Sequence, residues 1–232
     1  MKFVIESSFW DLFPEARIGV VWATGLDNRR GATEATTLLE TTGQEARNQV
    51  AESEIATYPA VAPWRDAYRA FGVKPAKYRS GIENLLRGAK AGGVRSINPL
   101  VDCYNAVALR HQLPCGGEDV ATIVGDLRLT RAVGSEMFVP LGADDPQPPN
   151  PGEVIYRDDL GVVCRAWNWR EAERTKLTEA TTAAFLCLEW LPPLAPDALD
   201  RACTDLATLV ADLLGASTRI ALLDRTAPET DA

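Results

Sequence analysis

The side chains best suited to chemistry lie in one block that follows a predicted strand. The block reads Trp167-Asn168-Trp169-Arg170-Glu171-Ala172-Glu173-Arg174-Thr175-Lys176. Tryptophan rings pack well on apolar or aromatic side chains. A carboxylate can hold an ammonium group, and an arginine can hold a carboxylate or a phosphate. The block is therefore typical of a site for an amino acid or an aminoacyl ester. The alternative is a structural tryptophan pair beside a charged surface turn.

A second candidate is a predicted helix over residues 99–111 and the double glycine beyond it. Asn98 is a good N-cap, and Pro99 suits the first helical position, where a missing N–H costs nothing. Three polar side chains stand early in this otherwise apolar helix: Asp102, Tyr104 and Asn105. Gly116-Gly117 lets a ligand or another backbone come close, just before Glu118. We expect a small-molecule pocket at the end of a buried helix.

Other routes to chemistry have less support in the sequence. His111 is the single histidine and stands at a helix end, where a surface or capping role is common. The five cysteines show no CxxC spacing, which disfavours a zinc site. The glycine pairs lack the strand–turn–helix frame of a phosphate or dinucleotide loop. We therefore expect no cofactor and no metal.

The elements that position these residues follow an α+β order, because helices and antiparallel strands are segregated along the chain. Strands are predicted at residues 2–6, 17–22, 126–133, 136–141, 153–156, 162–166, 184–191 and 220–223. Helices are predicted at residues 33–56, 64–71, 80–91, 99–111 and 196–214, with a capping box at Ser80 and Glu83 and a polar tail at 225–232. The apolar face of the 196–214 helix is expected to pack on the body or on a second copy, as a homodimer.

Charge and composition limit the partners. The net charge of −8 argues against a protein whose main task is to grip nucleic acid. A local basic cluster still offers a contact for a tRNA end: Lys77, Arg79, Arg87, Lys90 and Arg95. The alternative is an ordinary solvated helix face. The N-terminus lacks the apolar run of a signal peptide, and no stretch approaches the ~20 apolar residues of a membrane span, so we expect a cytoplasmic protein.

Three blocks, in order, resemble the B3/B4 domain of the phenylalanyl-tRNA synthetase beta subunit. They are residues 95–119, 126–142 and 151–182, and the likeness extends over roughly residues 78 to 190. The freestanding bacterial proteins built from that domain alone are more similar still. The resemblance implies a β-sandwich-like core flanked by helices. It also implies one domain over residues 1–232, with a core at about 78–191, an N-terminal extension at 1–77 and a C-terminal helix and tail at 192–232.

The resemblance also implies a site. The synthetase domain contacts the wrong amino acid through a glutamate, whose place here falls at Glu173, with Glu171 as the alternative. Its threonine early in the helix corresponds to Tyr104, its histidine to Gly116, and its glycine-rich turn to the Trp-Asn-Trp-Arg sequence. These departures match the freestanding proteins and change the lining of the pocket. The expected catalytic residues are Glu173 and Asn168, and the expected substrate-binding residues are Tyr104, Asn105, Gly116, Gly117, Glu118, Trp167, Trp169 and Arg170.

The function that follows is a freestanding editing factor, which hydrolyses the ester of a mischarged aminoacyl-tRNA. Such an ester is already activated, so holding it and a water in attack geometry supplies much of the rate. Backbone N–H groups near Gly116-Gly117 would stabilise the oxyanion. One alternative is a non-catalytic module that binds an amino acid or a tRNA end. Another is a hydrolase or binding protein for an unrelated small molecule.

Overall fold

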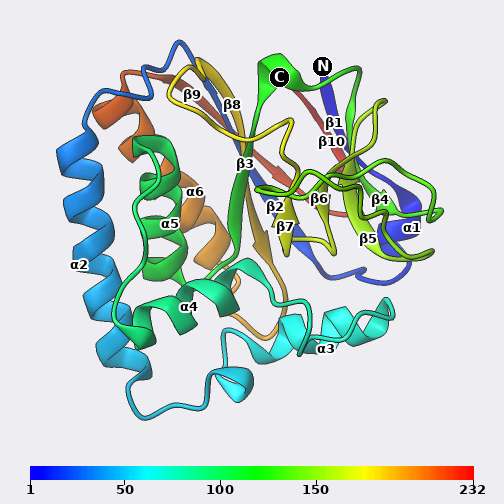
Figure 1. Cartoon of the computed structure of the whole chain (residues 1–232), viewed down its shortest axis with the longest axis horizontal. Coiled ribbons are helices and arrows are strands. Elements are labelled where there is room, and N and C mark those ends of the chain that lie inside the picture. Colours follow the sequence, from blue (N-terminus) through cyan, green and yellow to red (C-terminus); the bar gives the residue numbers. More distant parts are fainter.

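The computed structural model describes all residues 1–232 as two β-sheets with helices against one of them (Figure 1). The helices are α1 (Ser7–Trp10), α2 (Ala32–Val50), α3 (Ala62–Ala70), α4 (Gly81–Ala91), α5 (Pro99–His111) and α6 (Ala198–Leu214). The first five strands are β1 (Lys2–Ile5), β2 (Arg17–Thr24), β3 (Cys115–Asp119), β4 (Leu127–Arg131) and β5 (Val154–Arg157). The others are β6 (Val162–Arg165), β7 (Arg170–Glu171), β8 (Ala183–Trp190), β9 (Ser217–Leu223) and β10 (Glu229–Asp231).

The two sheets draw strands from both ends of the chain. The six-stranded sheet has the order β10-β1-β4-β5-β6-β7, and the four-stranded sheet has the order β3-β8-β2-β9. Only the β1–β4 pair is parallel. The early strands β1 and β2 are inner strands, so the first residues of the chain belong to the same two sheets as the rest.

Aromatic side chains fill the space between the sheets. Phe3 of β1 meets Phe185 of β8 with ring centroids 4.9 Å apart, and Trp22 of β2 meets Phe185 at 5.2 Å. Side chains alternate along β2, with Val20 in this core and Val21 in the core beneath the helices. Both faces of the four-stranded sheet are therefore buried. The predicted α+β class with a sandwich-like core is confirmed.

Helices cover the outer face of the four-stranded sheet. Figure 1 shows α5 and α6 beside this sheet, with α2 outside them, and α3 and α4 along one end. The apolar face of α6 is buried through Leu199, Leu206 and Val210. The rest of the same chain thus covers the apolar face of α6, which the sequence analysis also considered as a contact with a second copy. No helix combines the length and the apolarity that crossing a bilayer demands.

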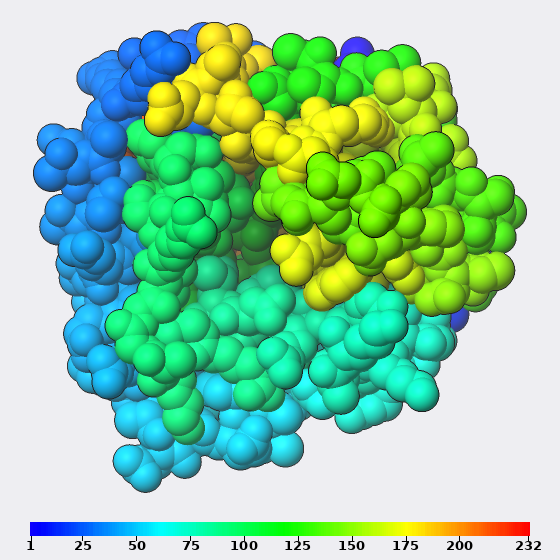
Figure 2. Space-filling model, in the orientation of Figure 1, coloured from blue at the N-terminus to red at the C-terminus, as the bar shows by residue number.

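A hollow marks one face of the molecule. Figure 2 shows it between the green of α5, the blue-green of α4 and the yellow segment around β7. The strand β3 follows α5 in the chain and runs through the middle of this view (Figure 1). The hollow is therefore bordered by both of the segments that the sequence singled out for chemistry.

One predicted strand is wrong. Residues 136–141 form no strand, because the Glu136 carboxylate accepts the N–H groups of Val133 at 2.7 Å and Gly134 at 2.8 Å and closes a turn. The polar tail contributes a strand that the sequence did not indicate, since β10 pairs with β1 through Lys2 and Asp231. The double glycine lies inside β3.

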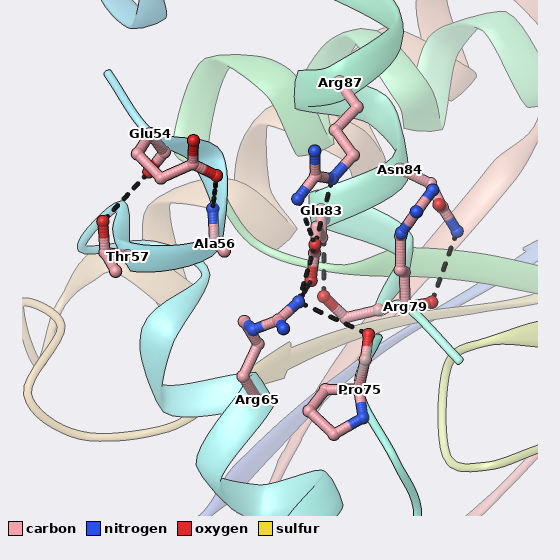
Figure 3. A network of polar contacts seen from close by, with 10 residues as sticks. Glu54, Ala56, Thr57, Arg65, Pro75, Arg79, Glu83, Asn84 and Arg87 are labelled. Carbon is pink, nitrogen blue, oxygen red and sulfur yellow. Dashed lines mark hydrogen bonds and ion pairs between the residues drawn. The ribbon is translucent and has the colours of Figure 1, made fainter. Parts of the chain in front are cut away.

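The capping box of α4 forms by half. The Ser80 hydroxyl accepts the Glu83 N–H at 3.3 Å, as predicted. The Glu83 carboxylate does not return to Ser80; it accepts bonds from Arg65 of α3 at 2.9 Å and Arg87 of α4 at 3.0 Å (Figure 3). Since the Glu83 side chain is fully buried, this pairing ties α3 to α4 and supplies the partners that a buried carboxylate requires.

Arg65→Met is expected to lower the free energy of unfolding by about 2 kcal/mol, because it leaves the buried Glu83 carboxylate with a single charged partner. Urea unfolding followed by circular dichroism measures this change. The matched control is Arg69→Met on the same helix, whose pair with Asp66 is exposed and contributes at most ~1 kcal/mol. Equal effects of the two substitutions would contradict a structural role for the Arg65–Glu83 pair.

Candidate functional site

A cavity of about 40 Å³ lies between the two sheets. Its lining consists of Cys115, Gly116, Gly117, Glu118, Tyr156, Cys164, Trp167, Asn168, Glu171, Phe185, Cys187 and Glu189. One water needs about 10–15 Å³ of such space, so the cavity has room for a few waters or for a small chemical group.

Strand pairing explains why these side chains meet. On β8, Phe185, Cys187 and Glu189 are spaced by two and share the face toward the six-stranded sheet. On β3, Gly116 pairs with Cys187 and Glu118 pairs with Phe185, so both residues share that face. The six-stranded sheet presents a cross-strand row in return, in which Cys164 pairs with both Tyr156 and Glu171.

Glu189 has the most defined surroundings in the cavity. Only 3% of the residue is exposed, and its carboxylate accepts the Tyr156 hydroxyl at 2.6 Å and the Asn168 amide. Burial raises the pKa of Glu189 to about 7, although both hydrogen bonds act to lower it. A carboxylate with this pKa can take up and release a proton at neutral pH.

A tight turn between β6 and β7 presents Asn168. Its first residues, Ala166 and Trp167, have φ angles of 49° and 63°, a left-handed conformation that costs about 1–2 kcal/mol for each such residue. The Trp167 ring compensates by packing on Phe9, Phe13 and Trp64, with centroids 4.9, 4.8 and 5.0 Å away. The side-chain oxygen Oδ1 of Asn168 accepts a hydrogen bond from the Tyr68 hydroxyl at 2.8 Å. Asn168 is therefore held from both sides.

Glu118 and Glu171 form an acidic pair in the same cavity. Burial, and then the neighbouring Glu171 charge, raise the pKa of Glu118 well above its usual value. Burial also raises the pKa of Glu171. Two close carboxyl groups in a buried site do not both ionise readily, so each carboxyl group makes ionisation of the other less favourable.

The cavity cysteines are not activated nucleophiles. Burial raises the pKa of Cys115, Cys164 and Cys187 well above the ordinary thiol value, so these groups stay protonated. All five cysteines of the chain are free thiols. No group of three or more His, Cys, Asp or Glu side chains is arranged to hold a metal ion. The carboxyl groups and Asn168 are thus the candidates for chemistry in the cavity.

Gly116 leaves space for the Glu171 carboxylate. A Cβ atom at Gly116 would lie 2.9 Å from Glu171 Oε1, closer than such contacts allow. Gly116→Ala is therefore expected to displace the Glu171 side chain and to abolish ligand binding in the cavity, while leaving the fold intact because the Gly116 backbone is ordinary strand. Ligand titration together with thermal unfolding tests this expectation. Unchanged binding would show that Glu171 does not have to stay where it lies.

The structure brings together part of the site expected from the sequence. Five of the expected residues line the cavity: Gly116, Gly117, Glu118, Trp167 and Asn168. Trp167 serves mainly as a core residue, with no exposed surface. Tyr104 is half-buried on α5 and is not part of the cavity lining. Asn105 is buried on α5 but does not line the cavity.

Other expected residues lie outside the cavity. Glu173 is on the surface, paired with Lys176 and accepting the Gly142 N–H at 2.9 Å. The glutamate of this block that reaches the cavity is Glu171, the second choice of the alignment. Trp169 stacks edge-on against Tyr78 at 4.5 Å, and Arg170 is exposed above the Trp169 ring. These two residues cover the outside of the turn.

The sequence did not point to Glu189 or to four other residues of the cavity lining. The one available signal was a carboxylate inside the otherwise apolar run of residues 183–191. Tyr156, Cys164, Phe185 and Cys187 gave no signal, because an apolar or half-apolar residue in a strand is ordinary core.

The basic cluster is only partly available for a ligand. Arg87 is bound to Glu83, and the Lys90 ammonium donates to the Ser53 carbonyl at 2.7 Å. Lys77, Arg79 and Arg95 are exposed and make no ion pair within the chain. Three cations of the five thus remain at the surface around α4.

The chain has similarity to a solved structure and to a family model. A search of solved structures finds an N-terminal fragment of the phenylalanyl-tRNA synthetase beta-subunit from Pyrococcus horikoshii, 14% identical, with a TM-score of 0.48. The match covers 94% of this chain and 50% of that one, so the chain spans about half the length of the fragment. A search of curated proteins finds no match. The family model described as "B3/4 domain" matches residues 63–215, most of the chain and all of the cavity lining. The chain therefore belongs to the B3/4 domain family.

Proposed function

We propose that this protein has a tRNA-related role and hydrolyses the ester bond of a mischarged aminoacyl-tRNA. Membership of the B3/4 domain family supports the class of substrate. The cavity supports the chemistry, since it holds a carboxylate, an amide and an acidic pair in a buried space beside an open hollow.

The observation that carries the proposal is Glu189 held between Tyr156 and Asn168 inside the cavity. With a pKa of about 7, this carboxylate can accept a proton from an attacking water and later give it to the leaving ribose oxygen. Asn168 fixes one carboxylate oxygen and reaches the cavity itself, so it can also orient the water. We therefore assign the proposed catalytic role to Glu189 in place of Glu173, with Asn168 retained.

The edge strand β3 offers backbone donors for the oxyanion. Asp119 donates its N–H to the Thr175 carbonyl at 2.9 Å, outside the four-stranded sheet. Since N–H groups along a strand alternate in direction, the Gly117 N–H points to the same open edge. Such a donor can stabilise the charge that develops on the ester carbonyl oxygen.

Hydrolysis of a panel of labelled, correctly and incorrectly charged tRNAs tests the proposal. Release of one wrong amino acid by the wild-type protein is expected, with strong loss in Asn168→Ala and Glu171→Gln. Glu173→Gln is the matched comparison within the same block, and its surface position predicts little effect. A strong effect of Glu173→Gln alone would favour Glu173, the residue expected from the family resemblance, over the glutamates that line the cavity. No release from any charged tRNA by well-folded protein would reject the deacylase.

A non-catalytic module that binds an amino acid or a tRNA end is the second candidate. The observation in its favour is that both carboxylate oxygens of Glu189 already accept a bond, so Glu189 also has a plain structural explanation. Tight binding of an amino acid or of charged tRNA without turnover would identify this function.

A further inference from the structure

The cavity contains acidic side chains without a matching basic one. Its lining includes three glutamates and no lysine, arginine or histidine. Arg174 acts on Glu118 from nearby, but its guanidinium is committed to Asp158 at 2.5 Å and to the Thr122 carbonyl at 3.2 Å. No basic side chain of this protein is therefore free to pair with the carboxyl groups of the cavity.

Two carboxyl oxygen atoms in the cavity have no partner within hydrogen-bond geometry. They are Oε2 of Glu118 and Oε2 of Glu171, both buried, and only 3% of Glu118 is exposed. The Thr175 hydroxyl, which acts on Glu118, is also buried without a partner. A buried carboxylate oxygen without a donor is destabilising, and both glutamates face the cavity.

We propose that the cavity binds a primary ammonium group of the substrate, held by Glu118 and Glu171. This inference rests on the proposed function and specifies which part of the substrate enters the cavity. An ammonium group has three N–H donors and no acceptor, so two donors satisfy the two unpartnered oxygens. Its positive charge offsets the effect of burial, which raises the pKa of both carboxyl groups.

The size of the cavity restricts what accompanies the ammonium. A space of about 40 Å³ admits the ammonium and a small substituent, while the remainder of the substrate extends toward the hollow. An ammonium of this kind has two sources in an aminoacyl ester, namely the α-amino group and the side chain of a basic amino acid. Both present the same chemistry to Glu118 and Glu171.

Binding of small amides to the intact protein, without tRNA, tests the inference. Alaninamide carries an α-ammonium, propionamide has the same shape without it, and Nα-acetyl-lysinamide carries a side-chain ammonium only. We expect alaninamide or Nα-acetyl-lysinamide to bind at least ~10-fold more tightly than propionamide by calorimetry, a difference of about 1.4 kcal/mol. The preferred compound identifies the source of the ammonium.

Glutamine variants test whether Glu118 and Glu171 make the contact with the ammonium group. Glu118→Gln and Glu171→Gln are each expected to reduce the preference for the ammonium compound to less than ~3-fold, whereas Glu179→Gln, an exposed glutamate paired with Arg29, is expected to keep it. Equal affinities of the wild-type protein for all three amides would overturn the inference even if a variant failed to fold. An unchanged preference in both folded variants would overturn it too.

The deacylation panel keeps the two proposals separate. Hydrolysis of a charged tRNA without any preference for ammonium compounds would leave the proposed function standing and reject the acidic-pair contact. A clear ammonium preference without hydrolysis would support the contact and reject the deacylase.

Discussion

Glu189→Gln is expected to lower kcat/KM for hydrolysis of the mischarged tRNA by about 10²–10⁴-fold, the range that general base catalysis contributes. Glutamine keeps the shape of the side chain and can still accept the Tyr156 hydroxyl, but it cannot take a proton from water. Single-turnover deacylation with enzyme in excess measures the chemical step directly. The control is Glu179→Gln, which removes an exposed carboxylate that does not line the cavity.

The pH profile gives this prediction a specific signature. The base must be unprotonated to act, and burial raises the pKa of Glu189 to about 7. The rate should therefore be low below pH 6, rise through pH 7 and level off above pH 8, because the pKa sets the midpoint. This rise should disappear in Glu189→Gln. A profile that keeps its midpoint in the variant would assign the titration to another group and contradict the role of Glu189.

Trp167→Ala is expected to lower the free energy of unfolding by about 3–5 kcal/mol, as large-to-small changes of buried aromatic residues do. The fully buried Trp167 ring contacts Phe9, Phe13 and Trp64. Its removal leaves a large void and also takes away the packing that offsets the left-handed backbone of the turn. Urea unfolding followed by tryptophan fluorescence and circular dichroism measures the loss.

Trp169→Ala is the matched control for this turn. The Trp169 ring is half-buried and packs on Tyr78, on the buried Arg165 and on the exposed Arg170. A loss of about 1 kcal/mol is expected, in line with a single aromatic contact of a half-buried ring. If the two alanine variants lost equal stability, the aromatic cluster around Trp167 would not be what holds Asn168 in place.

Local signals in the sequence were enough for several elements. The Asn98 cap of α5 forms as predicted, with its side chain accepting the Val101 N–H at 3.1 Å. The hairpin of β5 and β6 about residues 158–161 also forms, because Asp158 accepts the N–H groups of Leu160 and Gly161 at 2.9 and 3.1 Å. In each case the partners lie within a few residues, so the determinant is contained in the segment itself.

The missed features depend on partners far away in the chain. The choice between Glu171 and Glu173 requires the register of β7 on β6, and both residues lie on the same face of an extended chain, so alternation alone does not separate them. β7 ends at Glu171, which pairs with Cys164 above the cavity, while Glu173 has left the sheet. Glu189 and Gly116 acquire their neighbours only when the two sheets pack together.

The strands β1 and β2 are synthesised long before the strands with which they pair. β1 pairs with β4 and β10, and β2 pairs with β8 and β9, so neither strand has a partner until more than a hundred further residues have left the ribosome. These early strands read KFVI and RIGVVWAT, which are hydrophobic sequences with high β-propensity. Long-range pairing of this kind slows folding and exposes such segments to aggregation. A nascent chain paused before β8 should therefore recruit chaperones, and release should follow once β8 and β9 emerge.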